Sequence, residues 1–294
     1  MKSLALLTAL CLALPSAVFA DEAAAKMLPG QRVLVTGHSF HMPVMAGLDA
    51  VVKAAQIAGH QWAGRSSIGG SRVMQHWDLP DEKNIAKTAL RAGSVDVLTM
   101  APNWVVPDAA IDRFIDLGLE KNPQLRAFVQ ASWFPWDGLL PPQRVAKNED
   151  RDAKTIADLR LVGTPFMETI RTQVRETNAR LGRPVAFVVP VGEAVLRLRE
   201  KVIAGEVPGI TRQSELFTDP IGHAKAAVLQ LGAYCQFACI YHRSPVGLTC
   251  FEKPGDEASR QLNQLLQTIA WSTVCEEPLS GLPASLRSPA PARP

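Results

Sequence analysis

Four short segments of the sequence carry side chains that could act on one substrate. His223, with Asp219 four residues before it, could serve as a general base whose ring is held in one tautomer. Ser39 stands between an apolar run and a helical pattern, where its hydroxyl and its backbone N–H could point into a crevice. Gly70 could bring a backbone N–H, and Asn103 a side-chain amide, to the same point. Together these groups would supply a hydroxyl, a base and the donors that a developing oxyanion needs.

Each of these residues also has an ordinary structural interpretation, and the residues alone do not decide between the two. A serine that precedes a helix is more often its N-cap than a reactive group. Asn103 suits an Asx-turn, the glycines suit a plain turn, and Asp219 and His223 suit exposed caps before a helix. The functional interpretation depends on the combination, because three of the segments directly follow three successive predicted strands.

The elements that would position these side chains alternate along the chain. Short apolar runs predict five strands, and apolar residues at helical spacing predict helices between them. We expect the strands at 32–36, 60–64, 95–101, 125–132 and 184–191, and the helices at 43–58, 84–92, 108–121 and about 165–181. This alternation predicts an α/β fold of three layers, with a doubly wound, five-stranded parallel sheet of flavodoxin-like order. Its ligand site should lie at the carboxyl ends of the strands, near the point where the strand order reverses.

In their order along the chain, the four segments resemble those of the SGNH (GDSL-type) hydrolases, and in particular exported bacterial members. Residues 37–40, Gly-His-Ser-Phe, are similar to the family's Gly-Asp-Ser block, with His38 where the family has aspartate. Residues 67–71 (Ser-Ile-Gly-Gly-Ser) resemble the second block, and 101–104 (Ala-Pro-Asn-Trp) resemble the third, of which only Asn103 is kept. Residues 219–223 resemble the terminal Asp-x-x-His with one residue added, and the blocks together span 33 to about 247.

This resemblance implies the SGNH hydrolase fold and a set of roles. Ser39 would be the nucleophile, His223 its base, and Asp219 the group that orients the imidazole. The backbone N–H groups of Ser39 and Gly70, with the Asn103 amide, would form the oxyanion hole. The implied activity is that of an exported serine esterase or deacylase acting on a carboxylic ester of a small molecule or carbohydrate, with no cofactor and no metal. The longer spacing between Asp219 and His223 leaves open a Ser–His dyad that works without Asp219.

Two other functions stay open at this stage. The replacement at His38 and the longer terminal spacing would also suit a catalytically inactive binding protein of the same fold. The same site could instead transfer the acyl group to a sugar hydroxyl. Three further residues are candidates for lining a substrate pocket: His38, His41 and Trp104. The alternative is plain packing, with one histidine beneath the loop and the other exposed.

The composition excludes few functions. The 294 residues include 31 basic and 28 acidic side chains, a balance that argues against nucleic acid as a partner because phosphate binding needs a concentrated basic surface. The sequence contains no Gly-x-Ser-x-Gly elbow, no dinucleotide-binding fingerprint and no P-loop. It leaves the oligomeric state open.

We expect the chain to have three parts. Residues 1–20 have the layout of a secretory signal peptide, with Lys2, an apolar stretch from Leu4 to Leu14, and small residues ending at Ala20. The protein is therefore expected in the periplasm or outside the cell, with no membrane span in the mature chain because no other apolar run approaches about 18 residues. Residues 21–275 should form one hydrolase-like domain, with an irregular lid or disordered loop at 133–163. Residues 276–294, rich in Pro, Ser and Ala, should form a disordered tail.

The cysteines allow more than one state. Apart from the predicted signal peptide, the chain contains Cys235, Cys239, Cys250 and Cys275. Their even number favours disulfides in an oxidising compartment, although the sequence does not decide the pairing. Free thiols are the alternative. A zinc site is less favoured, because there is no Cys-x-x-Cys pair and no histidine at ligand spacing.

Overall fold

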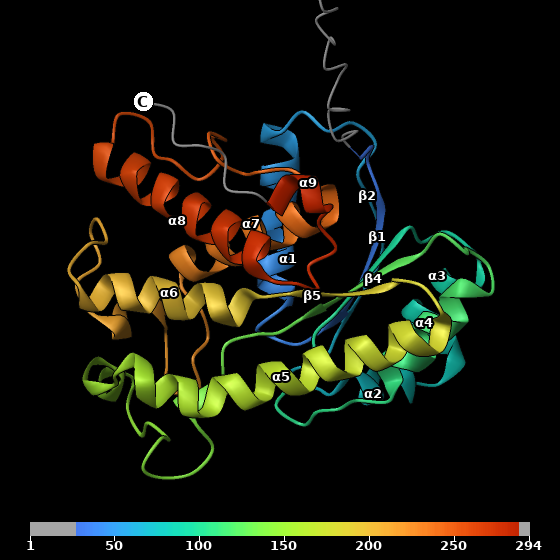
Figure 1. Ribbon diagram of the computed structural model, residues 1–294, viewed down its shortest axis with the longest axis horizontal. Coiled ribbons are helices and arrows are strands. Elements are labelled where there is room, and N and C mark those ends of the chain that lie inside the picture. Colours follow the sequence, from blue (N-terminus) through green and yellow to red (C-terminus); the bar gives the residue numbers. More distant parts are fainter. Residues whose placement is uncertain (1–27, 288–294) are drawn as a thin grey trace, which may run out of the picture.

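Five parallel strands form the centre of the molecule, in a computed structural model that describes residues 28–287 (Figure 1). The strands are β1 (Arg32–Gly37), β2 (Gln61–Ser67), β3 (Val97–Met100), β4 (Arg126–Gln130) and β5 (Ala186–Val189). Their order across the sheet is β2-β1-β3-β4-β5, the flavodoxin-like order that the sequence predicts. The order reverses between β1 and β3, which pair directly, so the loops that follow these two strands meet at the switch point.

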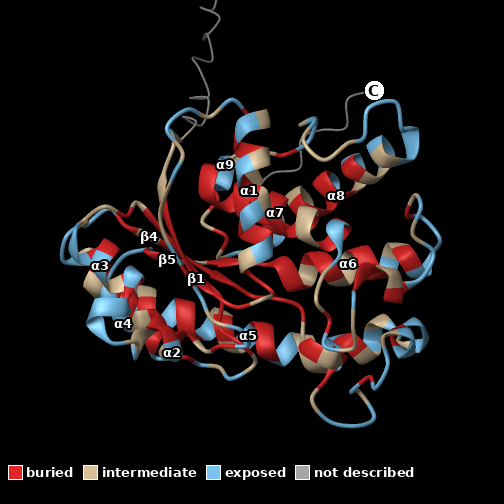
Figure 2. Ribbon diagram, turned by 180° about the vertical axis from the view of Figure 1, so that it is seen from behind, coloured by how far each residue is buried: buried red, intermediate tan, exposed pale blue. Residues whose placement is uncertain are grey.

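Helices cover both faces of the sheet and give the fold its three layers (Figure 1). On one face lie α1 (Met42–Ala54), α6 (Val191–Ile203), α7 (Ala226–Tyr241) and α8 (Glu257–Glu276). On the other face lie α2 (Val73–Trp77), α3 (Ile85–Arg91), α4 (Ala110–Leu119) and α5 (Ile156–Leu181). The strands are therefore buried on both sides (Figure 2), which explains why β1 and β3 are almost continuously apolar.

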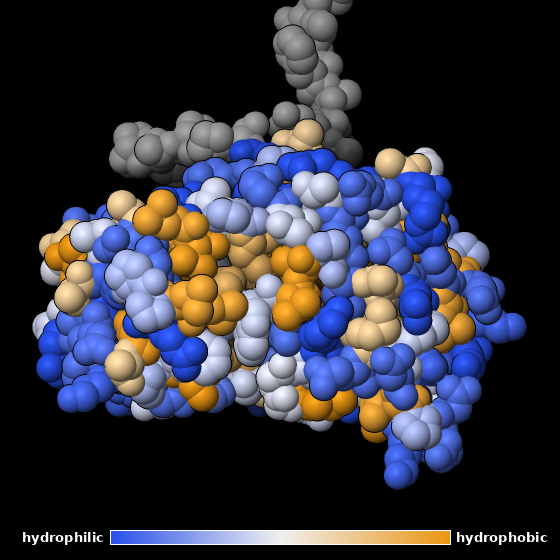
Figure 3. Space-filling model, turned by 90° about the horizontal axis from the view of Figure 1, so that it is seen from below, coloured by the Kyte–Doolittle hydropathy of each residue, from blue (hydrophilic) through white to orange (hydrophobic). Residues whose placement is uncertain are grey.

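Several short elements connect these layers. They are η1 (Asp81–Lys83), η2 (Pro135–Asp137), η3 (Asn148–Ala153), η4 (Gln213–Leu216) and α9 (Ala284–Arg287). Among residues 28–287, no helix has both the length and the apolar character that crossing a bilayer requires. On the face that carries α5, hydrophobic residues gather in patches separated by hydrophilic ones (Figure 3).

The observed α5 is longer than the predicted helix. It begins at Ile156, nine residues before the expected start near Pro165, which lies inside the helix. Thr155 caps its N-terminus, because its side chain accepts a hydrogen bond from the Asp158 N–H and Asp158 accepts one from the Thr155 N–H. The helix buries apolar side chains on both sides of the proline, which offsets the cost of interrupting its hydrogen bonds. The irregular stretch is therefore 133–155, and it is an ordered segment that contains η2 and η3.

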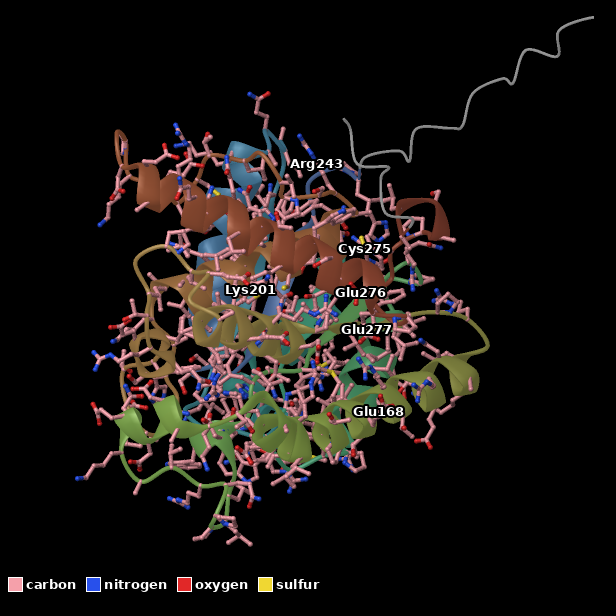
Figure 4. All side chains as sticks on the ribbon, turned by 60° about the vertical axis from the view of Figure 1, so that its left-hand side comes forward. Glu168, Lys201, Arg243, Cys275, Glu276 and Glu277 are labelled. Atoms are coloured by element: carbon pink, nitrogen blue, oxygen red, sulfur yellow. The ribbon has the colours of Figure 1, made fainter. Side chains whose placement is uncertain are left out.

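The final segment is also more ordered than the sequence predicts. Residues 276–287, expected as the start of a disordered tail, pack against the domain and include α9. The buried Glu277 carboxylate accepts hydrogen bonds from Arg171 Nε and Nη2, at 3.0 and 2.6 Å, and Figure 4 shows Glu277 just beyond α8 on the side of α5. The Leu279 carbonyl accepts from the Val188 N–H at 2.9 Å, so the segment covers the outer edge of β5. Residues 288–294 of the predicted tail and the predicted signal peptide lie outside the described residues.

The four cysteines of the described chain are free thiols, so the favoured disulfides are wrong for them. Cys235 and Cys239 are fully buried within α7, and burial raises the pKa of both thiols well above its usual value. Such cysteines pack as small apolar side chains. An even number of cysteines does not fix their state, because a disulfide also needs two sulfur atoms to face each other.

Candidate active site

Ser39 lies in the turn between β1 and α1. The N-cap of α1 is His41, so Ser39 is not the helix cap that its position also allowed. Its hydroxyl instead forms a hydrogen bond with the His223 ring, and Ser39 Oγ lies 3.0 Å from His223 Nε2. The turn requires glycine at Gly37, because a Cβ there would lie 2.4 Å from Nδ1 of His41.

His223 and Asp219 stand at the two ends of a tight turn that leads into α7. Asp219 Oδ2 lies 2.6 Å from His223 Nδ1, and Oδ1 accepts hydrogen bonds from the Gly222 and His223 N–H groups at 2.9 and 3.3 Å. Gly222 has a φ of +101°, a conformation that residues with a Cβ rarely adopt. The turn accommodates the extra residue between the aspartate and the histidine, because it folds the carboxylate back onto the ring.

The hydrogen bonds assign the tautomer of His223. An ionised carboxylate can only accept, so Nδ1 carries the ring proton and Nε2 presents its lone pair to the Ser39 hydroxyl. Burial alone would raise the pKa of Asp219, but hydrogen bonds from the His223 ring and from the backbone of Gly222 and His223 bring it below its usual value. The ring can therefore accept a proton from Ser39 beside a charged Asp219.

Gly70 and Asn103 lie beside Ser39 at the carboxyl ends of the strands, and all three line one pocket. Asn103 Nδ2 donates to the Gly70 carbonyl at 3.0 Å, and Asn103 Oδ1 accepts from the Val105 N–H at 2.8 Å. The asparagine therefore forms an Asx-turn and also retains a second amide N–H. Within residues 28–287, neither the Ser39 nor the Gly70 N–H donates a hydrogen bond. Three N–H donors thus remain available around one pocket.

A buried histidine supports the loop that contains Gly70. His76 Nδ1 lies 2.7 Å from Ser66 Oγ, and His76 Nε2 lies 2.8 Å from Ser71 Oγ. The two serines flank the glycines, so the ring ties both ends of the loop to α2. Burial lowers the pKa of His76 to about 4, which keeps the ring neutral near pH 7.

The two histidines next to Ser39 have different surroundings. His38 lines the pocket, but its ring is engaged with the protein, since Nδ1 accepts from the Phe40 N–H and Nε2 lies 3.2 Å from the Pro102 carbonyl. Burial lowers its pKa. His41 is fully buried, contacts the Thr36 carbonyl through Nδ1 at 3.2 Å, and does not line the pocket. The expectation that His41 contacts substrate is wrong, as is the expectation that one of the pair is exposed, because α1 packs His41 against the end of β1.

Trp104 lines the pocket together with other aromatic and apolar side chains. The pocket has a volume of about 390 Å³ when the solvent space at its open mouth is included, and its apolar walls include Phe40, Trp104, Trp133, Phe166 and Ile221. Trp104 packs edge-on against Trp136, with ring centroids 5.9 Å apart, and Phe40 stacks on Trp133 at 4.7 Å. Among residues 28–287 no cluster of three or more His, Cys, Asp or Glu side chains could hold a metal ion.

A buried ion network behind the pocket was not predicted from the sequence. Asp137 accepts hydrogen bonds from Arg151 Nη1 at 2.5 Å and from Arg199 Nη1 and Nη2 at 2.9 and 2.8 Å. Arg151 Nη2 also donates to the carbonyls of Asp219 and Pro220, at 3.2 and 2.5 Å. The network therefore holds the start of the turn that carries His223. Its partners are 14 to 69 residues apart in sequence, and the only local signal was a charged cluster at 147–154.

Trp133 holds the other end of the same turn. Its indole N–H donates to the Gly222 carbonyl at 2.8 Å, while its ring stacks on Phe40. Phe40 in turn packs edge-on against the His223 ring, with centroids 5.6 Å apart. Residues 133–155 belong to the stretch 133–163 that was expected to be a lid or a disordered loop, and they include residues that hold the turn in place.

Comparisons with known proteins find solved structures that are similar to this chain in fold. No protein-family model and no curated protein matches the chain. A solved structure of a DUF4886 family protein from Bacteroides uniformis ATCC 8492 is 13% identical, covers 82% of this chain and 93% of its own, and has a TM-score of 0.52. A candidate SGNH hydrolase from Slackia heliotrinireducens is 17% identical, covers 70% of this chain and 97% of its own, and has a TM-score of 0.43. At such identity, the similarity to the DUF4886 family protein is one of fold alone.

Proposed function

We propose that this chain is a serine esterase or deacylase that hydrolyses carboxylic esters. The observation that carries the proposal is the hydrogen-bonded series from Ser39 Oγ to His223 Nε2, at 3.0 Å, and from His223 Nδ1 to Asp219 Oδ2, at 2.6 Å. Such a series lets a hydroxyl lose its proton to the base as it attacks a carbonyl carbon.

In the acylation step, Ser39 Oγ bonds to the ester carbonyl carbon and its proton moves to His223 Nε2. The carbonyl oxygen becomes an oxyanion, for which the Ser39 and Gly70 N–H groups and the second Asn103 N–H are the proposed donors. Each such donor is worth roughly 3 kcal/mol where it has been measured in other enzymes. The C–O bond to the alcohol then breaks, and the alcohol leaves with the proton from His223.

In the deacylation step, water replaces the alcohol. His223 Nε2 takes a proton from the water as its oxygen bonds to the acyl carbon, and returns a proton to Ser39 Oγ as the acid leaves. Asp219 stabilises the imidazolium that forms in both steps, because its carboxylate lies against Nδ1. Its remaining oxygen is occupied by backbone N–H groups, which fix the carboxylate in this position.

The test of this function is labelling by a fluorophosphonate probe together with hydrolysis of p-nitrophenyl acetate and butanoate. We expect the unchanged protein to be labelled and active, and Ser39→Ala to be neither. A protein that resists labelling and hydrolyses no ester would favour the alternative of a binding protein. Product analysis with an added sugar acceptor separates hydrolysis from acyl transfer.

We also propose that the protein works outside the cytoplasm, on a small-molecule or carbohydrate ester. The support is the layout of residues 1–20, with one basic residue, an apolar stretch and small residues before Asp21. Intact mass measurement of the protein from cell fractions checks this proposal. A mature chain that begins at Asp21 in the periplasm or medium is expected, and a full-length cytoplasmic chain would contradict it.

A further inference from the structure

The walls of the pocket beside Ser39 are apolar to an unusual degree for a site that would recognise a sugar. Five aromatic or aliphatic side chains from five segments contribute: Phe40, Trp104, Trp133, Phe166 and Ile221. Phe40, Trp133 and Phe166 are almost completely buried, whereas Ile221 lies at the exposed rim. An apolar group that enters between these walls would lose its own contact with water, which is the main driving force for binding it.

The polar side chains of the same pocket are already engaged with the protein. Both ring nitrogens of His38 contact backbone groups, and Ser132 Oγ accepts from Gln130 Nε2 at 2.8 Å. The Asn103 side-chain oxygen accepts from the Val105 N–H, and one of its amide N–H groups donates to the Gly70 carbonyl. Beyond Ser39 and the proposed oxyanion donors, the walls thus offer little that could recognise several hydroxyl groups.

The position of His223 shows which half of an ester would enter the pocket. In the proposed reaction, the leaving alcohol must take a proton from His223 Nε2, so it lies on the side of that ring. His223 is not among the residues that line the pocket, and its side chain is 36% exposed. The alcohol therefore faces solvent, and the acyl group points away from His223 between the aromatic walls.

We infer that this pocket is an acyl-binding site for an apolar acyl group larger than acetyl. The inference rests on the proposed esterase function and names its substrate class. The alcohol half, which faces the open side, is not restricted by the pocket. The substrates expected are thus esters of aliphatic acids with several carbon atoms, with acetylated sugars expected to be poor ones.

A neighbouring cavity provides a matched control. It lies between α5 and α6 and has a volume of about 680 Å³ when the solvent space at its mouth is included. It shares only Ser132 and Trp133 with the pocket beside Ser39. Charged pairs line it, including Arg160 with Glu193 and Arg199 with Asp137. Ser39 does not line this cavity. Leu196, on α6, lines this cavity but not the acyl pocket. Leu196→Ala therefore enlarges the neighbouring cavity and leaves the walls of the acyl pocket unchanged.

The experiment measures kcat/KM for p-nitrophenyl acetate, butanoate, hexanoate and octanoate, and for a peracetylated monosaccharide. We expect kcat/KM to rise by about fourfold for each added methylene until the pocket is full, because each buried methylene contributes about 0.8 kcal/mol. Trp104→Ala removes a half-buried wall and should lower kcat/KM for hexanoate by about tenfold while changing acetate little. Leu196→Ala should leave the chain-length profile unchanged.

Two results would overturn the inference, and they differ from a failure of the function. If the enzyme reacts with fluorophosphonate but hydrolyses acetate and the longer esters equally well, the esterase function is supported and the acyl-binding site is refuted. The same holds if Leu196→Ala, rather than Trp104→Ala, changes the chain-length profile. If the protein reacts with neither the probe nor any ester, both the esterase function and the acyl-binding site are refuted.

Discussion

Replacement of Arg151 tests how the turn that carries Asp219 and His223 is held. The Arg151 guanidinium is fully buried, pairs with Asp137 and donates to the carbonyls of Asp219 and Pro220. Arg151→Met keeps a long unbranched side chain but removes every donor. Two partly buried carbonyls would lose a hydrogen bond, and Asp137 would retain one of its two cationic partners.

We expect the free energy of unfolding to fall by about 3–5 kcal/mol, the usual cost of breaking a buried ion pair. In a domain of this size that corresponds to a fall in Tm of roughly 10 °C. At a temperature where the variant is folded, kcat for p-nitrophenyl butanoate should fall by about 100-fold, because a shift of a catalytic group by 1 Å has that effect. KM should change little, since Arg151 does not line the acyl pocket.

Arg199→Met is the matched control for this prediction. Arg199 is also buried and donates to both oxygens of Asp137, but it makes no hydrogen bond to the 219–223 turn within the described chain. Circular dichroism should show a similar loss of Tm, whereas kcat should remain close to that of the unchanged protein. Equal losses of kcat in the two variants, measured well below both Tm values, would refute the view that Arg151 positions the turn.

Three further predictions follow from the site and the core. Asp219→Asn should lower kcat by about three to four orders of magnitude, because an amide NH₂ facing Nδ1 would force the ring proton of His223 onto Nε2. Steady-state kinetics check this prediction, and a small loss of kcat would indicate a Ser–His dyad. Burial lowers the pKa of His41 to about 3, so its stabilising contribution is complete above its unfolded value of about 6.5 and is lost as the pH falls below it. Urea unfolding should therefore show about 2 kcal/mol less stability at pH 5 than at pH 7.5 from this residue, and His41→Asn should remove that part of the pH dependence. Iodoacetamide should modify Cys235 and Cys239 only in denaturant, and modification without denaturant, seen by intact mass, would contradict their burial as free thiols.

The strands and their order were predictable because buried parallel strands have a simple signature. Most residues of β1 and β3 are apolar or β-branched, and helical patterns separate the strands, which restricts the topology. The extents of α5 and of the C-terminal segment could not be predicted, because the local sequence signals there were misleading. Pro165 predicts a helix start, although the Thr155 cap lies ten residues upstream. The composition of 276–287 does not reveal that Glu277 pairs with Arg171.

The four segments of the candidate site could be predicted from the sequence, but the contacts that hold them in place could not. The segments follow strands whose carboxyl ends must meet, so the proximity of Ser39, Gly70 and Asn103 follows from topology. The approach of His223 does not, because it depends on a turn held by Arg151 and Trp133. Those contacts join residues far apart in sequence, and neither spacing nor periodicity gives a signal for them.

His38 shows how a residue that departs from the resembled motif can take a structural role in the same place. Its Nδ1 accepts the Phe40 N–H at 3.2 Å, and its Nε2 lies 3.2 Å from the Pro102 carbonyl, so one ring joins the loop that carries Ser39 to the loop that carries Asn103. An ionised aspartate could accept the first hydrogen bond but could not donate the second. Only a neutral histidine makes both, and burial favours that form by lowering its pKa. Protonation at low pH would remove the acceptor at Nδ1, so acidification should break the hydrogen bond from the Phe40 N–H and loosen the connection between the two loops.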